Sequence, residues 1–157
     1  MTDTENILIS EQGWFDLIDE IATRYGNGQL ISHDWLRWRF GLKDLDLGDY
    51  PGTAEFINAV RDQQFSYMTL VEKLRIKLLE QLQICIRNVW GEGYEVVPSV
   101  DQTRYGYDNF IKDMSKAMKE AKRIMNNVAN VDAEQQVKDN DLRAKFAQLT
   151  HMINAAK

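Results

Sequence analysis

Residues 54 to 81 contain neither glycine nor proline, and this stretch constrains the fold more than any other feature of the sequence. Apolar side chains recur along it at helical spacing: Phe56, Ile57, Val60, Val71, Leu74, Leu78 and, just beyond it, Leu82. Such a period predicts an α-helix that buries one face. We expect either one long helix capped by Thr53 or two helices joined by a bend between residues 63 and 66.

Two shorter helices are expected before the long one. Ser10 can cap the first, which ends at the glycines of residues 26 to 28 and carries a helical series of apolar residues: Trp14, Leu17, Ile18, Ile21 and Tyr25. Ser32 can cap the second, with the sequence HDWLRWRF, which stops near Gly41. Residues 42 to 52 are rich in turn formers and acids, so we expect a loop there.

A β-hairpin is expected after the long helix. The sequence RNVWGEGYEVV places β-branched and aromatic residues on both sides of a Gly-Glu-Gly triplet. We expect strands over residues 84–89 and 94–97, closed by Pro98. Gly91 and Gly93 permit the positive φ angles of a tight turn, and Trp90 and Tyr94 can pack the hairpin onto the body of the domain.

Two amphipathic helices are expected in the last third of the chain. Their apolar residues alternate between spacings of four and three, with a break near residues 130 to 132: Phe110, Met114, Ala117, Ala121, Ile124 and Val128, then Leu142, Phe146, Leu149 and Ile153. Seams of this kind are typical of coiled coils. The simplest interpretation is an antiparallel helical pair on the domain's own surface. The alternative is a homodimer interface, which would place two reading heads on symmetric DNA half-sites.

The sequence therefore predicts a mainly α protein with a small β-hairpin. Its order of helix, short capped helix, long helix and two-stranded ribbon is that of a winged helix-turn-helix, with the ribbon as the wing. RNVWGEGYEVV also resembles the wing of OmpR-type response regulators, and VEKLRIKLLEQL resembles the end of that family's recognition helix. The likeness covers about residues 69–97. We expect a winged-helix-like domain over residues 10–98 and a helical extension over residues 99–157.

The resemblance implies a set of residues that contact DNA. Lys73, Arg75 and Lys77 on the long helix would face the groove. Arg87 and the wing, with Trp90, would lie near the DNA backbone.

The segment HDWLRWRF offers a second candidate contact, because Arg37 and Arg39 are interleaved with Trp35 and Trp38. Such a strip can stack on bases or contact phosphates. We prefer the alternative in which both tryptophans fill the core and both arginines lie solvated beside acids.

The distribution of charge leaves two functional hypotheses. The net charge is -5, and the first 63 residues hold 12 acids against 5 bases, whereas residues 98–157 hold 8 against 10. Glu72, Glu80 and Glu92 lie within the segments that would meet DNA, and carboxylates repel phosphates. The first hypothesis is a small, non-enzymatic DNA-binding regulator of transcription. The alternative is an acidic protein-interaction or inhibitor module, of the kind that phages and mobile elements encode, acting on a host nucleic-acid enzyme.

Other chemistry is not supported by the sequence. His33 and His151 lie far apart without ligands at metal spacing, and the aspartates of residues 44 to 49 lack the glycine that a calcium loop needs. Cys85 stands alone in an apolar run. We therefore expect no cofactor, no metal and no enzymatic activity.

The expected location is the cytoplasm. No apolar run approaches the roughly 20 residues of a membrane span, and the first ten residues lack the basic start and apolar centre of a secretory signal. A single cysteine fits a reducing compartment.

Overall fold

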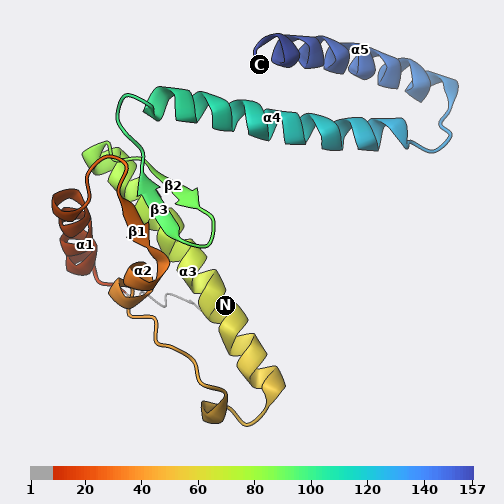
Figure 1. Cartoon of the computed structure of the whole chain (residues 1–157). Helices are drawn as coiled ribbons and strands as arrows, with labels where there is room; N and C mark the ends of the chain where they lie inside the picture. The colour runs from red at the N-terminus through yellow and green to blue at the C-terminus, as the bar shows by residue number, and fades with distance from the viewer. Residues whose placement is uncertain (1–8) are drawn as a thin grey trace. The chain divides into compact units, whose positions relative to one another are not determined.

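The computed structural model describes residues 9–157 and confirms a mainly α fold with a small antiparallel sheet (Figure 1). The chain divides into two compact units, one that runs to Gln102 and one over Thr103–Lys157. Within the described residues, no helix is long and apolar enough to cross a membrane. The expectation about a secretory signal concerns mainly residues 1–8, which lie outside the described part.

The first two helices begin at the serines that the sequence indicates. Helix α1 spans Glu11–Arg24, and the Ser10 hydroxyl accepts a hydrogen bond from the Gly13 amide at 3.1 Å. Helix α2 spans His33–Arg39, and the Ser32 hydroxyl accepts one from the Trp35 amide at 3.2 Å. Each hydroxyl satisfies an amide that has no partner inside the helix, which stabilises the helix start.

Helix α3 spans Thr53–Leu82 without a break, which decides between the two alternatives for this stretch. The expectation that Thr53 caps it is wrong: Gly52 is the N-cap and contributes no side-chain hydrogen bond, so Thr53 is already helical. At the other end Gln83 adopts a left-handed conformation with φ 56°, which terminates the helix. The preceding loop contains a short 3-10 turn, Leu47–Asp49, capped by the Asp46 carboxylate.

The sheet has three strands, one more than the sequence indicates. Strands β2 (Ile86–Val89) and β3 (Gly93–Val96) form the expected hairpin, and β1 (Leu30–Ser32) pairs antiparallel with the other side of β3. The strand order is β1-β3-β2. Strand β1 was missed because three residues are too few to show an alternating pattern.

The core of the first unit lies between α3, the two short helices and the sheet. The buried stripe of α3 consists of Tyr67, Val71, Leu74 and Leu78. Buried residues of the other elements close around it, namely Trp14, Leu17, Ile18 and Ile21 of α1, Ile31 of β1, Leu36 of α2, Phe40, Ile86 of β2 and Val96 of β3. The 3.6-residue period of these helices therefore marks the core correctly.

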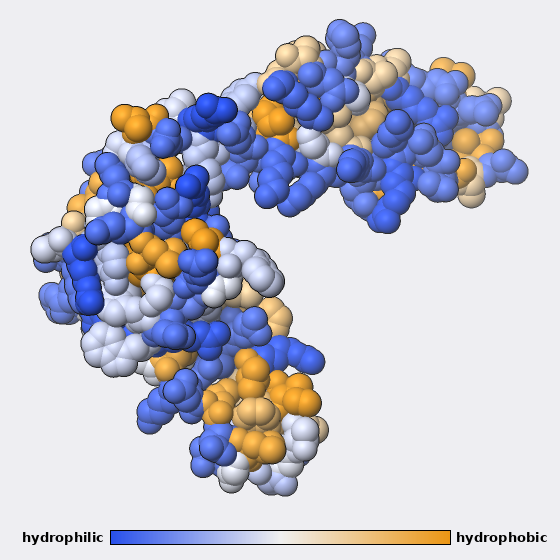
Figure 2. All heavy atoms as spheres, in the orientation of Figure 1, coloured by the Kyte–Doolittle hydropathy of each residue, from blue (hydrophilic) through white to orange (hydrophobic). Residues whose placement is uncertain are grey.

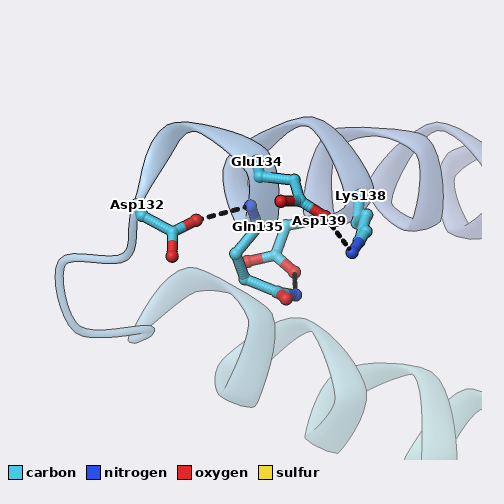
Figure 3. Close-up of polar contacts among 5 residues, drawn as sticks. All are labelled: Asp132, Glu134, Gln135, Lys138 and Asp139. Atoms are coloured by element: carbon cyan, nitrogen blue, oxygen red, sulfur yellow. Dashed lines mark hydrogen bonds and ion pairs between the residues drawn. The ribbon is translucent and has the colours of Figure 1, made fainter.

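The second unit is a pair of helices, α4 (Gln102–Asn126) and α5 (Ala133–Ala155). Asp132 caps α5 by accepting a hydrogen bond from the Gln135 amide at 2.8 Å, and Figure 3 shows this cap beside the Gln135–Asp139 and Glu134–Lys138 contacts of the first turns. The Arg143 guanidinium donates to the Met125 carbonyl at 2.9 Å, which ties the two helices together. Neither helix contains a fully buried residue.

Alanine substitution of the two hairpin glycines should destabilise the fold to different extents. Gly91 has φ +76° and open space around its Cα, so Gly91→Ala should cost about 1 kcal/mol through backbone strain. Gly93 has φ +154°, and an added Cβ would lie 2.1 Å from the Ile31 carbonyl oxygen of β1. Gly93→Ala should therefore destabilise more, by about 3 kcal/mol or more, because strands β1 and β3 must separate. Urea denaturation measures the free energy of unfolding of both variants. Equal destabilisation would contradict the role of the close approach between Gly93 and the Ile31 carbonyl.

Candidate interaction surface of the first unit

The β2–β3 turn carries an exposed tryptophan. Trp90 is 92% exposed, so the expectation that it packs the hairpin onto the domain is wrong. Tyr94 does pack: its ring lies edge-on to that of His33, with centroids 5.5 Å apart. The Glu92 carbonyl accepts a hydrogen bond from the His33 amide, which fixes the turn against the start of α2.

Arg87 lies on β2 opposite Glu95 of β3, and the two side chains form an ion pair at 2.8 Å. Cross-strand pairs of opposite charge are a common stabilising contact of antiparallel sheets. The Arg87 guanidinium is thus bound to a carboxylate at the position where the resemblance implies a phosphate contact.

The cations of α3 do not share one face. The ammonium groups of Lys73 and Lys77 lie 5.4 and 5.8 Å from the ring centre of Trp14 in α1. Arg75 lies about 200° around the helix from Lys73 and pairs with Glu72 at 3.1 Å. Lys73 and Lys77 therefore lie on the side of α3 that faces α1, whereas Arg75 lies on a different side of the helix.

The arginines of α2 also have partners. Arg37 lies over the Tyr67 ring at 5.0 Å, and Arg39 pairs with Glu20 of α1 at 2.9 Å. Trp35 is half-buried against the core, as expected. The expectation that Trp38 fills the core is wrong, because its side chain is 69% exposed.

The outward side of α3 carries an apolar stripe that the sequence interpretation did not single out. We call it the α3 stripe: Phe65, Met68, Ile76 and Leu79, with exposed fractions between 47% and 62%. Glu72 lies within it, at helical spacing from Met68 and Ile76. A second helical series, offset from the buried one along residues 54 to 81, is the sequence signal that could have found it. Orange spheres mark apolar surface on the first unit in Figure 2.

A polar cluster lies beneath the hairpin. The Tyr67 hydroxyl is 2.7 Å from Nδ1 of His33, and burial raises the pKa of this phenol, with smaller contributions from Tyr94 and Asp34 and an opposing one from Arg37. Burial likewise raises the pKa of the Cys85 thiol, with a smaller opposing contribution from Arg75.

Among residues 9–157, no cluster of three or more His, Cys, Asp or Glu side chains is arranged to hold a metal ion. A hollow of about 710 Å³ lies beside α2 and the following loop, and its lining includes the acidic Asp34 and Asp44 and the basic Arg37 and Lys43. Mixed charges of this kind do not define a ligand class.

The chain matches no family model, no curated protein and no solved structure.

The Tyr67 hydroxyl is expected to stabilise the fold through its contact with His33. Tyr67→Phe should lower the free energy of unfolding by about 1 kcal/mol, because the imidazole loses its partner in a partly buried site. Tyr94→Phe is the matched control and should change stability much less, because the ring contact with His33 remains. Urea denaturation of both variants measures the difference, and equal losses would show that the contact contributes little.

Proposed function

We propose that the chain is a non-enzymatic protein-binding module whose first unit docks through the α3 stripe. The observation that carries the proposal is an exposed apolar row on the longest helix of an acidic unit. Exposed apolar surface rimmed by polar residues is typical of protein interaction sites.

The charges of the first unit support a protein partner over DNA. Affinity for DNA comes mainly from cations that neutralise phosphates. Residues 9 to 102 hold 15 acidic and 9 basic side chains. The six cations implied in DNA contact already have a carboxylate or an aromatic ring as partner: Lys73, Arg75, Lys77, Arg87, Arg37 and Arg39.

The same charges describe the partner. Glu72 and Glu80 lie on α3 beside the apolar residues of the stripe and are exposed, and Glu72 pairs with Arg75. Glu80 and the excess of acidic side chains in the first unit therefore give this surface its negative charge. A complementary surface has an apolar centre and a basic rim. Nucleic-acid enzymes present basic surfaces to their substrates, so a host enzyme of this class is the partner we propose. The chain has a single cysteine and cannot form an internal disulfide, which supports a reducing, cytoplasmic setting.

Substitution in the α3 stripe tests this function. Met68→Asp and Ile76→Asp should each lower the affinity for the partner at least tenfold, because a carboxylate would be buried against an apolar surface. The partner is first isolated from the native host with the full chain and identified, and binding is then measured with purified components. Phe15→Asp on α1, at a side chain that is also 60% exposed, is the control and should bind normally. Equal binding by all three variants would contradict the role of the stripe.

A DNA-binding regulator is the second candidate. The element order of the first unit is that of a winged helix-turn-helix, and the bare Trp90 lies at the turn that would be the wing. An exposed aromatic ring can stack on a base or insert beside a sugar.

Salt dependence separates the two candidates. A DNA-binding regulator should bind random duplex DNA weakly at low salt, with affinity that falls steeply as salt rises. Arg87→Ala should then weaken binding evenly across sequences and reduce the salt slope by about one unit, while Glu92→Lys should strengthen binding. Fluorescence anisotropy with labelled DNA measures all three proteins. A protein-binding module should give no binding at any salt concentration.

A further inference from the structure

A groove runs between α4 and α5 of the second unit. Two hollows, of about 290 and 190 Å³, share the side chains of Lys122, Phe146 and Thr150, so they are parts of one groove. On α4 its lining extends from residue 115 to residue 126, and on α5 from residue 143 to residue 157. The groove therefore follows both helices for about three turns or more.

The exposed apolar residues of the pair lie on its other side. Ile124 comes two residues after Lys122, so it lies about 200° around α4 from that wall of the groove. It lines a separate hollow with Leu142 of α5 and with Asp139, the acid one turn before Arg143. Arg143 borders both hollows. The groove and the apolar side are therefore two different surfaces of the second unit.

The floor of the groove is apolar. It is formed by Met118 and Met125 of α4 and by Phe146 and Ala147 of α5. The first three are only half-buried, because two paired helices cover each other on one side. A third apolar surface laid into the groove would remove these side chains from water, which favours binding. Methionine side chains also adapt to the shape of a partner.

The rim of the groove is basic. Its lining contains four cations: Lys119 and Lys122 of α4, and Arg143 and Lys157 of α5. Among the described residues that line the groove, none has a carboxylate side chain. Arg143 donates to the Met125 carbonyl and Lys157 to the Asn154 amide oxygen, and both acceptors are neutral. Within residues 9–157, Lys119 and Lys122 have no ion-pair partner.

The acids of the two helices do not neutralise this rim. Asp113 and Glu120 of α4 lie about 160° to 180° around the helix from Lys122. Both are paired with cations of α4, at 3.9 and 2.7 Å. The Asp139 carboxylate accepts a hydrogen bond from a side chain of its own helix at 2.8 Å. Three further acids are ion-paired within their own helices: Asp108, Glu134 and Asp141. The positive charge of the groove is therefore available to a ligand.

The shape of the groove favours a helix as its ligand. The groove is open along one side, whereas sites for small molecules enclose most of the ligand. A nucleic-acid strand would need exposed rings on which its bases stack, and the one ring in the described lining, Phe146, forms the floor. A helix laid into a groove presents apolar side chains to the floor every three or four residues. Cations on both walls then select acidic side chains on both flanks of that helix.

We propose that this groove binds an acidic amphipathic helix of a partner protein. The apolar face of the partner helix packs on Met118, Met125 and Phe146, and its carboxylates lie against Lys122 on one wall and Arg143 on the other. The proposal does not depend on the α3 stripe, which belongs to the acidic first unit. With both surfaces occupied, the chain would hold two partners of opposite charge.

A synthetic peptide tests the ligand class with the full-length chain. The probe is a fluorescein-labelled helix of about 18 residues, or five turns, with leucines at intervals of three and four residues and glutamates on both flanks. Fluorescence anisotropy at about 0.15 M ionic strength should give a dissociation constant below about 100 μM. The same peptide with glutamine in place of each glutamate should bind at least about tenfold more weakly, because it lacks the charges. Equal affinities, or no binding of the acidic peptide, would overturn the proposal.

A carboxylate introduced into the groove gives a second readout with a matched control. Ala147→Glu places it beside Phe146 in the lining and should lower the affinity for the acidic peptide at least about tenfold. Gln148→Glu adds the same charge at the next residue, about 100° further around α5 and outside the lining, and should change the affinity by less than about twofold. Circular dichroism confirms that both variants keep their helices. Equal affinities of the two variants would overturn the proposal.

Nucleic acid is the other polyanion that a basic rim attracts. Lys122→Glu should lower the affinity for the acidic peptide at least about tenfold, and Lys138→Glu, an equal charge change outside the groove, should leave it unchanged. Met68→Asp in the α3 stripe should also leave it unchanged, so the two surfaces are tested separately. A labelled single-stranded oligonucleotide should not displace the peptide. An oligonucleotide that displaces it, and that binds Lys122→Glu more weakly than the native protein, would assign the groove to nucleic acid and overturn the proposal.

Discussion

The first unit depends on one packing stripe, the buried side of α3. Tyr67, Val71, Leu74 and Leu78 span three turns, and α1, α2 and the sheet all bury their apolar residues against it. Each of the smaller elements is too short to be stable by itself: α2 has seven residues and β1 has three. Their conformations are therefore set by the surface that α3 offers, and the position of the hairpin follows from it.

How much of the first unit could be predicted from the sequence depends on whether each element shows a pattern of its own. Helices α1, α2 and α3 were predictable because their apolar residues recur at one period and, for α1 and α2, because serine caps mark their starts. Strand β1 was not, because its pairing with β3 depends on Gly93, whose missing side chain lets the Ile31 carbonyl approach closely. Such a contact between residues far apart in sequence leaves no local pattern.

The candidate site was less predictable than the fold, for an electrostatic reason. A cation in a sequence shows its charge but not its partner. Arg87 and Arg39 look available for phosphates until the structure places Glu95 and Glu20 beside them. The exposure of an apolar residue is equally hard to predict from the sequence. The pattern of α2 predicts a buried Trp38, yet only Leu36 of this helix is fully buried. The α3 stripe is exposed because the other elements of the first unit cover only the opposite side of α3.

The strand order also bears on how the protein behaves when it is concentrated. Because β3 is central, the sheet has two edges, β1 and β2, and an exposed edge can pair with another chain and start aggregation. Here the β1 edge is only three residues long. The β2 edge is four residues long and carries the exposed, polar Arg87 and Asn88. Short edges with a charged residue offer a poor template for strand addition, so this sheet resists edge-to-edge pairing at high concentration.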